Sequence, residues 1–590
     1  MPSDSRNTIL FVVLTTAILL LYYTFVQAPE VRRQQAAAQA AAAAHAQQGL
    51  AAASAAPVVL SRAQALALSP RVRIDTPNLQ GSVALKGGRI DDLWLKSYKQ
   101  TLAPNSPPVE LFRPEGAANS YFADFGWAGP PGLPGQDTPW TLAEGQVLSP
   151  GHPLVLTYRS PEGLDFTRTL SVDDKFMFTV SDTAANHGSA PVTLAPYATV
   201  QRQGLPADVF TAINVHQGAV GWLDGGLRME AYKSWKKKGE VDQTSTGGWL
   251  GITDKYWMAV LAPDQREPIK AAFRVTPAQG VDIYDSSFLG QSRVIAPGQQ
   301  VSETTHLFAG AKRSSLLQQS PHARGVPELD RAIDWGRLMI ITQPVFGLLE
   351  FLYHHVGNVG VAILLLTICI RLVLFWPANK SYESTTKMKK VQPEIEKIRA
   401  RYKDDAAKQQ QETLAFYQRE RINPFMGCLL MLPTIPMFLA LFKVLSVTIE
   451  MRQAPFLFVR DLSAPDPTTI WNLFGLIPWD PSTLPMVGSL FGPAGMLHIG
   501  VWALAYGFTM TLSNSMTPTT GMDPTQRKMM QYMPLVMMVF LARFTVGLLI
   551  YYTWSNLLTL IQQYVIMHRF KVENPIDTLL DRVRGRQKAA

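Results

Sequence analysis

The most constraining feature of this sequence is an uninterrupted apolar run that opens at Gly357 and closes at Pro377. At ~1.5 Å of rise per residue it predicts about 30 Å of helix, enough to cross the hydrocarbon core of a bilayer. One permanent positive charge, Arg371, lies a few residues from its end. Burying that charge near the bilayer centre costs roughly 2.5–3.5 kcal/mol. Two interpretations stay open: the side chain reaches the lipid headgroups, or it faces a water-filled cavity inside a helix bundle.

The chain of 590 residues is too long for one ordinary domain. Long apolar runs cluster after residue 356 and near the N-terminus, whereas residues 58–320 have the composition of a soluble domain. The formal net charge of +9 concentrates between and after the apolar runs, where it indicates membrane topology and not nucleic-acid binding. The two cysteines, Cys369 and Cys428, lack metal-ligand spacing, so we expect neither a disulfide framework nor a metal site.

Near the N-terminus, residues 8–27 are free of charge and long enough to span a membrane. A cleaved signal peptide is the alternative, because Val26-Gln27-Ala28 resembles a small-residue cleavage site. The run is longer than a usual signal core, however. We therefore expect an uncleaved transmembrane anchor in residues 1–28 and an Ala- and Gln-rich flexible linker in residues 29–57.

Strand signals fill residues 58–320. Residues 82–85 lead through a turn at 86–89 into 90–95, and the same enrichment in β-branched and aromatic residues recurs at 167–180, 192–200, 249–261 and 271–275. This pattern predicts a large all-β antiparallel sandwich. Five aromatic residues either line a ligand cleft or belong to core and rim packing: Trp94, Tyr98, Trp222, Tyr232 and Trp235. We find no nucleophile elbow, phosphate-binding glycine loop or metal triad in this region, so we expect no catalytic residue.

Two amphipathic segments flank the Arg371 run. Residues 321–356 contain an apolar stripe at helical spacing, which predicts a helix that lies in the membrane interface and bends at Pro344. The stripe consists of Leu338, Ile341, Val345, Leu348 and Leu352. Residues 378–425 hold eleven Lys and Arg against seven Asp and Glu. An apolar seam at helical spacing is followed by a turn at 403–405 and a second helix at 409–421, which predicts a helical hairpin. The seam consists of Met388, Val391, Ile395, Ile398 and Tyr402. The basic face of the hairpin would meet anionic lipid or a ribosome, or would simply be solvated.

Three more apolar runs follow, at residues 426–449, 494–513 and 533–565. The last has 33 residues with Arg543 near its middle, so it is expected to fold as two arms with Arg543 at the outer turn. Residues 450–493 hold two basic against four acidic residues, as an outside loop should, and the tail 566–590 holds six against three. The predicted fold is a polytopic α-helical membrane protein: an N-terminal anchor, a large outside β-domain, and a five-span core at 357–565, with both termini inside.

Several segments of the chain form a collinear set: Thr367-Ile368-Cys369-Ile370-Arg371, Asn423-Pro424, Cys428, Pro436-Met437-Phe438, Arg452-Gln453-Ala454-Pro455-Phe456, Asp461-Leu462-Ser463-Ala464-Pro465-Asp466-Pro467, Met516-Thr517-Pro518-Thr519-Thr520, Asp523-Pro524, Lys528-Met529-Met530, Tyr551-Tyr552, Ser555-Asn556 and Gln562-Gln563. The set resembles the YidC/Oxa/Alb family of membrane protein insertases, in its Gram-negative form. The resemblance is strong over 331–570 and weaker over 58–320, where it rests on Gly87-Gly88-Arg89-Ile90 and Gly247-Gly248-Trp249 with Tyr256-Trp257.

The resemblance implies a membrane protein insertase and chaperone of the bacterial inner membrane, with cytoplasmic N- and C-termini. It would act on nascent membrane proteins alone, or with the Sec translocon and its accessory subunits. The β-domain would be a periplasmic β-supersandwich related to sugar mutarotases, without an enzymatic role. The resemblance implies no cofactor, no metal and no nucleic-acid binding. Anionic phospholipid, and a ribosome at the basic hairpin and tail, would be further partners.

Carried over by residue, the resemblance makes Arg371 the charge of a hydrophilic substrate groove. Thr367, one turn earlier on the same helix face, and Tyr552 on the last span would be its polar neighbours. Thr434 stands where close relatives often have Gln. The chain departs from the family pattern at the turn 543–547, which lacks the usual Pro, and at Pro433, which is an addition.

Three other functions compete with insertion. A small-solute or anion channel or transporter would use Arg371 as its selectivity charge. An assembly scaffold would have the β-domain as its active part. An intramembrane protease is disfavoured, because His498 and Ser513 on one helix would lie about 22 Å apart.

Overall fold

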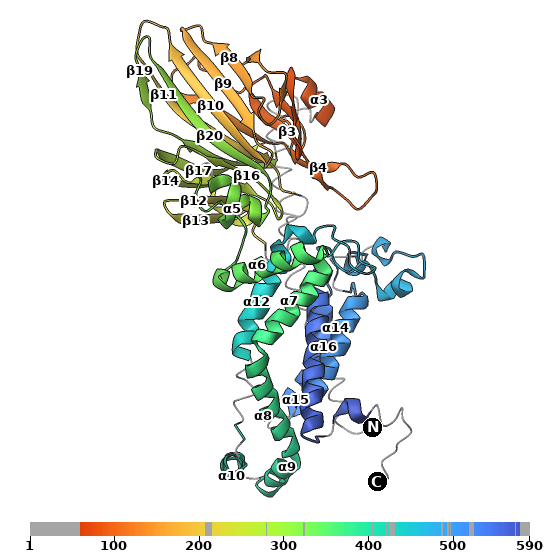
Figure 1. Cartoon of the computed structure of the whole chain (residues 1–590). Helices are drawn as coiled ribbons and strands as arrows, with labels where there is room; N and C mark the ends of the chain where they lie inside the picture. The colour runs from red at the N-terminus through yellow and green to blue at the C-terminus, as the bar shows by residue number, and fades with distance from the viewer. Residues whose placement is uncertain are drawn as a thin grey trace, which may run out of the picture.

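The structure is a computed structural model with a β-sandwich at one end and a helical bundle at the other (Figure 1). It describes residues 60–206, 215–278, 280–322, 325–403, 405–420, 422–423, 431–484, 488–492, 495, 497–517, 524–572 and 574–578. The anchor and linker predicted for residues 1–57, Cys428 and most of the tail 566–590 lie outside these described residues.

Two sheets form the sandwich, which confirms the predicted fold of this region. The first sheet has the order β14-β17-β18-β11-β5-β3-β2-β1-β7, with β19 paired to β11 and β4 paired to β3. Its strands are β1 (Arg71–Asp75), β2 (Leu79–Ala84), β3 (Arg89–Lys99), β4 (Pro108–Phe112), β5 (Tyr121–Ala128), β7 (Val147–Leu148), β11 (Val192–Gln203), β14 (Glu240–Thr246), β17 (Pro268–Ala278), β18 (Val281–Leu289) and β19 (Arg293–Ile295).

The second sheet has the order β13-β12-β15-β16-β20-β10-β9-β8-β6. Its strands are β6 (Thr141–Glu144), β8 (Leu154–Arg159), β9 (Leu164–Val172), β10 (Met177–Asn186), β12 (Gly218–Leu223), β13 (Gly226–Ala231), β15 (Trp249–Thr253), β16 (Trp257–Ala262) and β20 (Gln300–Ala311). Short helices border the sandwich: α3 (Arg62–Ala67), α4 (Tyr232–Lys238), α5 (Ser314–His322) and η2 (Leu329–Ala332). The described strands pair antiparallel except for β1 with β7.

Strict alternation along β9 shows why the two sheets face each other. Leu164, Phe166, Leu170 and Val172 are buried, and the residues between them are not. Every second residue of a strand points to the same face, so one apolar face seals against the opposite sheet. The middle inward position of β9 is Arg168, which is only 1% exposed. A cation therefore occupies the centre of an otherwise apolar face.

Two segments predicted as continuous strand signals are hairpins. Residues 167–180 divide between β9 and β10, and residues 249–261 divide between β15 and β16. The five aromatic residues singled out from the sequence fall into two groups. Tyr232 and Trp235 are 3% and 0% exposed and pack on Tyr284, so they belong to the core and cannot line a cleft. Trp94 and Trp222 each lie under an arginine, and Tyr98 meets the edge of Trp257.

The helical half begins with α6 (Met339–Val356) and ends with α16 (Val546–Arg569). Between them lie α7 (Val359–Val373), α8 (Phe375–Lys390), α9 (Gln392–Arg401), α10 (Ala406–Arg419), α12 (Met431–Val447), η3 (Ile449–Met451), η4 (Ile470–Gly475), η5 (Pro481–Thr483), α13 (Gly488–Phe491), α14 (Val501–Met516) and α15 (Pro524–Leu541). Among the described residues no single helix is both long and apolar enough to cross a membrane. The bent pair α7 and α8 passes that test together, and α12 contains a shorter apolar helix, Leu432–Val447.

The prediction of one helix from Gly357 to Pro377 was wrong. The helix ends at Val373, and α8 departs from its axis by 69°. Pro377 is the third residue of α8, a position where a helix lacks an internal partner for the N–H and proline therefore costs no hydrogen bond. The carboxamide of Asn358 accepts a hydrogen bond from the Val361 N–H and sets the start of α7. Arg371 thus lies in the last turn of α7, next to the bend.

The basic hairpin has the predicted seam but a broken first arm. Ile395 and Tyr417 are buried, and Met388, Val391 and Ile398 pack beside them. Val391 separates α8 from α9, so the arm is two helices, and the second arm begins at Ala406. Of the predicted seam, Tyr402 instead lies under the ammonium of Lys408. The hairpin occupies the end of the bundle opposite the sandwich (Figure 1).

Helix α14 begins at Val501 and not at residue 494. The Asp466 carboxylate accepts a hydrogen bond from the Trp502 N–H at 2.8 Å, and the Thr468 hydroxyl accepts one from the Val501 N–H at 3.0 Å. These groups cap the helix from a distant loop. His498 therefore precedes the helix, which corrects the premise that it shares one with Ser513. Its ring nitrogens lie 2.7 Å and 3.1 Å from two backbone carbonyl oxygens, of Asp466 and Phe491.

The chain reverses at Arg543 as predicted. Helix α15 ends at Leu541, α16 begins at Val546, and Arg543 is exposed between them. Both helices pack on α14. The N–H groups of Val546 and Gly547 donate to the carbonyls of Ala464 and Leu462 at 2.8 Å and 3.1 Å, so the turn is fastened to the loop before α14. Helix α16 continues to Arg569, beyond the predicted end at 565.

An ion pair at Asp334 helps to join the sandwich to the bundle, as does a longer one between Arg313 and Glu450 at 3.7 Å. Asp334, in the loop before α6, pairs with Lys443 of α12 at 2.5 Å and accepts a hydrogen bond from the His216 N–H at 2.9 Å. Helix α6 lies across this junction and packs on α7 and α12 (Figure 1). Burial raises the pKa of Asp334, but Lys443 and the His216 N–H outweigh it, so the pKa is below its usual range.

We expect Asp334→Asn to loosen this junction. A hydrogen bond to a charged group is worth about 1.5–3 kcal/mol, so amides around His216 and at the end of α12 should exchange hydrogen at least ~10-fold faster at pH 7. Because the folded pKa of Asp334 is depressed, the wild-type junction should keep its protection until the pH falls below the ordinary carboxyl pKa. Asp330→Asn, four residues earlier, is the matched control. Equal exchange in the two variants would rule out the ion pair as the fastening.

Candidate substrate groove

The side chain of Arg371 extends from the last turn of α7 to α16. Its Nη2 donates to the hydroxyl of Ser555 at 2.6 Å and to the Ser555 carbonyl at 2.8 Å. Beside it lies a hollow of about 350 Å³ between α7, α8 and α16, lined by Ile368, Arg371, Leu372, Phe375, Asn379, Leu558, Ile561, Gln562, Val565 and Ile566. The guanidinium is therefore part of the wall of a cavity.

No carboxylate neutralises this charge within the described part of the chain. Arg371 donates to the hydroxyl and carbonyl of Ser555, which are both neutral. Asn379 and Gln562 are the other polar groups of the wall, and Gln562 Nε2 is buried without a hydrogen-bond partner among the described residues. The rest of the wall is apolar. The hollow thus offers a fixed positive charge and unused hydrogen-bonding capacity to whatever enters it.

The mouth of the hollow is strongly apolar and exposed. Leu372, Phe375, Ile561 and Val565 are 67%, 53%, 53% and 58% exposed. Exposed side chains of this size, gathered around one charge, are rare on proteins that meet only water. The arrangement suits a chain with a polar end beside an apolar stretch.

The other three predicted groove residues do not line this hollow. Thr367 is 1% exposed, and its hydroxyl donates to the Ile363 carbonyl of its own helix at 2.7 Å. Thr434 is exposed on α12. Tyr552 is 6% exposed, and its ring stacks on Phe438 of α12 at 4.8 Å between centroids. These three residues therefore do not line the hollow beside Arg371, and their part in a substrate groove stays a prediction.

Helix geometry explains why Thr367 and Tyr552 lie away from the hollow and why Ser555 and Gln562 lie beside it. A threonine inside a helix readily returns its hydroxyl to the carbonyl four residues earlier, which removes Thr367 from the cavity. On α16, Ser555 and Gln562 lie seven residues apart, two turns along one face, whereas Tyr552 faces α12 and α14. Residues Asn379, Ser555 and Gln562 were missed as site residues. The seven-residue spacing of the last two was a visible signal for a shared polar face.

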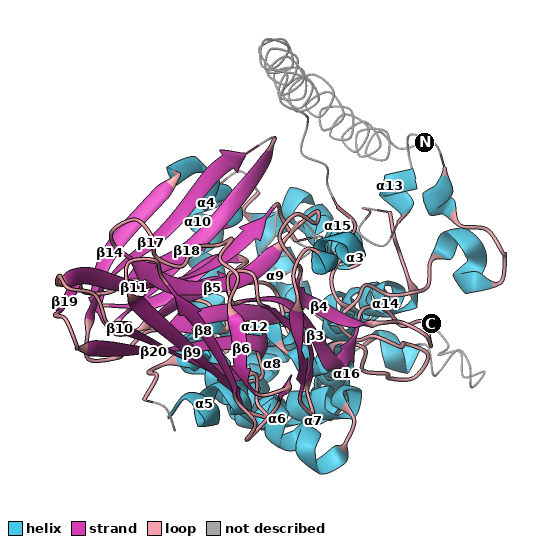
Figure 2. Ribbon diagram, turned by 90° about the horizontal axis from the view of Figure 1, so that it is seen from above, coloured by secondary structure: helices cyan, strands magenta, loops and turns pink. Residues whose placement is uncertain are grey.

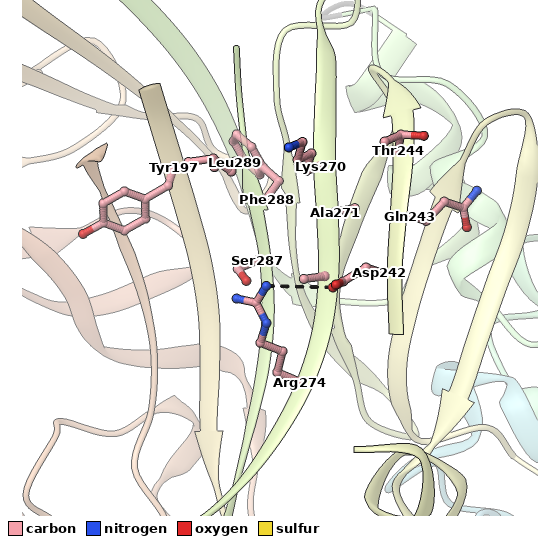
Figure 3. A pocket seen from close by; sticks show the side chains of 11 residues that line it. Tyr197, Asp242, Gln243, Thr244, Lys270, Ala271, Arg274, Ser287, Phe288 and Leu289 are labelled. Carbon is pink, nitrogen blue, oxygen red and sulfur yellow. Dashed lines mark ion pairs between the residues drawn. The ribbon is translucent and has the colours of Figure 1, made fainter. Parts of the chain in front are cut away.

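A second hollow, of about 460 Å³, lies on the sandwich (Figure 3). Its wall comes from β11, β14, β17 and β18, and Arg274 extends towards Asp242 across it at 3.8 Å. Arg274 also pairs with Glu240. The charge of Arg274 is thus already neutralised within the sandwich, whereas the charge of Arg371 is not. In the described residues no group of three His, Cys, Asp or Glu side chains is placed to hold a metal ion.

Comparison with known proteins gives consistent matches along the chain. Residues 71–348 match a family model described as the YidC periplasmic domain, and residues 351–574 match one described as 60Kd inner membrane protein. A membrane protein insertase YidC of Caulobacter vibrioides (strain NA1000 / CB15N) is 53% identical over 558 residues, covering 91% of this chain and 90% of that protein. The YidC of Beijerinckia indica subsp. indica is 47% identical over 526 residues, covering 87% and 85%.

Among solved structures, the chain is similar to an active YidC insertase crystal structure with its first transmembrane domain resolved. That match covers 84% of this chain and 94% of the other, at 16% identity and a TM-score of 0.36. A likeness at this level carries no structural argument, and the expected relation of the sandwich to sugar mutarotases stays a prediction.

Proposed function

This chain belongs to the YidC family of membrane protein insertases of the bacterial inner membrane, and from that premise we propose that the hollow at Arg371 receives the polar flank of a client protein. Membrane insertion moves a polar segment across a medium that solvates no backbone groups, at several kcal/mol for each unsatisfied group. A cavity that offers a charge and hydrogen-bonding groups part of the way across shortens that path. The observation that carries the proposal is the un-neutralised Arg371 on the wall of a hollow with an apolar mouth.

The apolar helix of the client would leave along α12 and α15. Large apolar side chains are exposed on both helices: Leu432, Ile435 and Leu439 on α12, and Leu535, Val536 and Phe540 on α15. Such surfaces let an apolar segment slide without fixed polar contacts. Transfer of that segment into lipid supplies the driving force, so no nucleotide is required. The activity is therefore insertion and not an enzymatic reaction.

The finer topology belongs to the same proposal. Helices α7, α12, α14, α15 and α16 would be the five spans, with α6 in the outer interface and the basic hairpin and tail in the cytoplasm. Charge supports this orientation, because residues 378–425 are net basic and residues 450–493 are net acidic. The N-terminal segment 1–28 would be the sixth span. The Sec translocon, a ribosome and anionic lipid would be the partners, while the channel alternative has no observation specifically in its favour.

Site-specific photocrosslinking tests where a client lies. A photoreactive amino acid placed at Leu372 or Ile561, on the mouth of the hollow, should crosslink to a stalled nascent membrane protein. The same amino acid at Val294, which is 67% exposed on the sandwich, is the control and should give only background. Crosslinks from Val294 but not from Leu372 would move the client-binding site to the sandwich.

A further inference from the structure

The segment between α12 and α14 carries an unusual concentration of exposed apolar side chains. In the ten residues 471–480, two tryptophans and four other large apolar residues face outwards: Trp471, Leu473, Phe474, Leu476, Ile477 and Trp479. Leu476 is 83% exposed, among the most exposed apolar side chains of the described structure. Single exposed apolar residues are common, but a contiguous group of this size marks a surface that something else covers. We call residues 471–479 the tryptophan loop.

Hydrogen bonds within the chain hold the tryptophan loop in place. Trp471 Nε1 donates to the Leu497 carbonyl at 2.6 Å, and its ring meets Phe491 edge-on at 5.1 Å. The Phe474 N–H donates to the Thr469 carbonyl at 2.8 Å, and the Ile477 N–H to the Asn472 carbonyl at 3.1 Å. These backbone N–H groups are satisfied inside the loop, while the apolar side chains stay exposed. That division leaves the apolar side chains available to contact acyl chains at the inner edge of the headgroup layer.

Two residues of the loop have a strained backbone conformation. Leu473 and Phe474 have φ values of 47° and 61°, in the left-handed region that bulky residues avoid. The hydrogen bonds to Thr469 and Asn472 hold this turn.

The position of the loop points to the bilayer interface. Figure 1 shows the segment between α12 and α14 spreading sideways from the upper ends of α14 and α16, below the sandwich. Figure 2, seen from above, shows α13 standing out beyond the edge of the bundle. If α14 and α16 cross the bilayer, this level is the boundary between acyl chains and headgroups on the sandwich side.

The composition around the loop matches that boundary. Residues 461–500 contain three aspartates and neither lysine nor arginine. Tryptophan prefers the headgroup level, where its ring meets apolar chains and its N–H meets polar groups. The exposed apolar surface continues next to α14, because Phe458, 48% exposed, stacks on Trp502 in the first turn of that helix. Phe508, 70% exposed, extends it along α14. Exposed apolar side chains both on the loop and along α14 favour lipid over a separate protein partner.

We propose that the tryptophan loop is an interfacial membrane anchor that lies in the outer headgroup region and binds the lipid surface itself. The inference rests on the proposed function, because it requires α14 and α16 to cross the bilayer. The anchor would hold the outer ends of these helices at a constant depth. Asp466 links the two parts directly, since its carboxylate caps α14 a few residues before the loop begins.

A spin label at the loop measures its depth. In a full-length Cys369→Ser/Cys428→Ser background, a nitroxide is attached at Leu476→Cys and the protein is placed in vesicles of phosphatidylethanolamine and phosphatidylglycerol. A label at Val294→Cys, which is 67% exposed on the sandwich, is the control. Collisions with oxygen, which concentrates in lipid, are compared with collisions with a water-soluble nickel chelate. We expect the Leu476 label to be shielded from the chelate at least fivefold relative to the Val294 label, and to be more accessible to oxygen.

Equal chelate accessibility at the two sites would overturn the proposal. Shielding at Leu476 that appears only when translocon is added, or only when labels on two copies broaden each other's spectra, would also overturn it in favour of a protein contact. Client insertion is measured in the same vesicles. Normal insertion with a water-exposed Leu476 refutes the anchor alone, whereas a lipid-shielded Leu476 without insertion refutes the proposed function and leaves the anchor standing.

Discussion

Arg371→Ala should reduce the insertion of clients with acidic translocated tails by about 10- to 30-fold and leave clients with neutral tails nearly unchanged. Opposite unit charges ~8 Å apart attract by about 2 kcal/mol at an effective dielectric constant of ~20, which corresponds to roughly 30-fold in occupancy. No carboxylate of the described residues competes for this guanidinium, so its attraction is available to the client. The measurement is the insertion rate of two clients that differ only in tail charge, in vesicles at low salt.

Two further variants separate the effect of the Arg371 charge from the effect of its hydrogen bond to Ser555. Arg371→Lys keeps the charge and should keep most of the preference for acidic tails, although it loses the Nη2 group that donates to Ser555. Ser555→Ala removes one hydrogen bond and should change both clients by a similar small factor. Raising the salt concentration should weaken the preference if the hollow is wet. An equal loss of both clients in Arg371→Ala would mean that the residue holds α7 to α16 and does not attract clients.

Arg168→Ala should lower the free energy of unfolding of the sandwich by about 3–5 kcal/mol, the largest stability effect that we expect from one substitution. Arg168 Nε and Nη2 each lie 2.7 Å from a carboxylate oxygen of Asp182. Nη2 and Nη1 also donate to the carbonyls of Phe125 and Gly88 at 2.7 Å and 2.9 Å. Truncation leaves a buried carboxylate, two carbonyls without this donor and a cavity.

The double variant Arg168→Met/Asp182→Leu is the control, because it removes both charges and leaves apolar side chains of similar size. It should recover most of the lost stability. Hydrogen exchange of the β9 and β10 amides in the full-length chain, followed as urea is raised, measures both variants. A single variant no less stable than the double variant would show that the ion pair contributes little.

The same variant tests whether the sandwich is the active part of the protein. Arg168 lies far from α7 and α16, in the face between the two sheets. At a temperature that unfolds the sandwich of Arg168→Ala but not the bundle, client insertion should persist. A parallel loss of insertion and of the sandwich would favour the scaffold alternative, in which the β-domain does the work.

Local patterns were enough to predict the layered plan of the chain. Alternation in β9 and the turn before Ile90 report burial and chain reversal within a few residues, so the sandwich follows from them. The turn at Arg543 was also predictable, because a charge halfway along a 33-residue apolar run disfavours one straight helix. The seam of the basic hairpin, centred on Ile395, was predictable from its helical spacing. Arg371 stood out because a permanent charge in an apolar run is costly.

Tertiary structure decided where helices begin and which side chains meet. The start of α14 depends on Asp466, more than thirty residues before it in the chain, and no window around Val501 contains that cap. The partner of Arg371 is Ser555, 184 residues away, and not Thr367 one turn back, since the rotation of α16 about its axis is set by packing on α14. Periodicity determines which face of a helix is apolar, whereas only the packed bundle determines what that face touches.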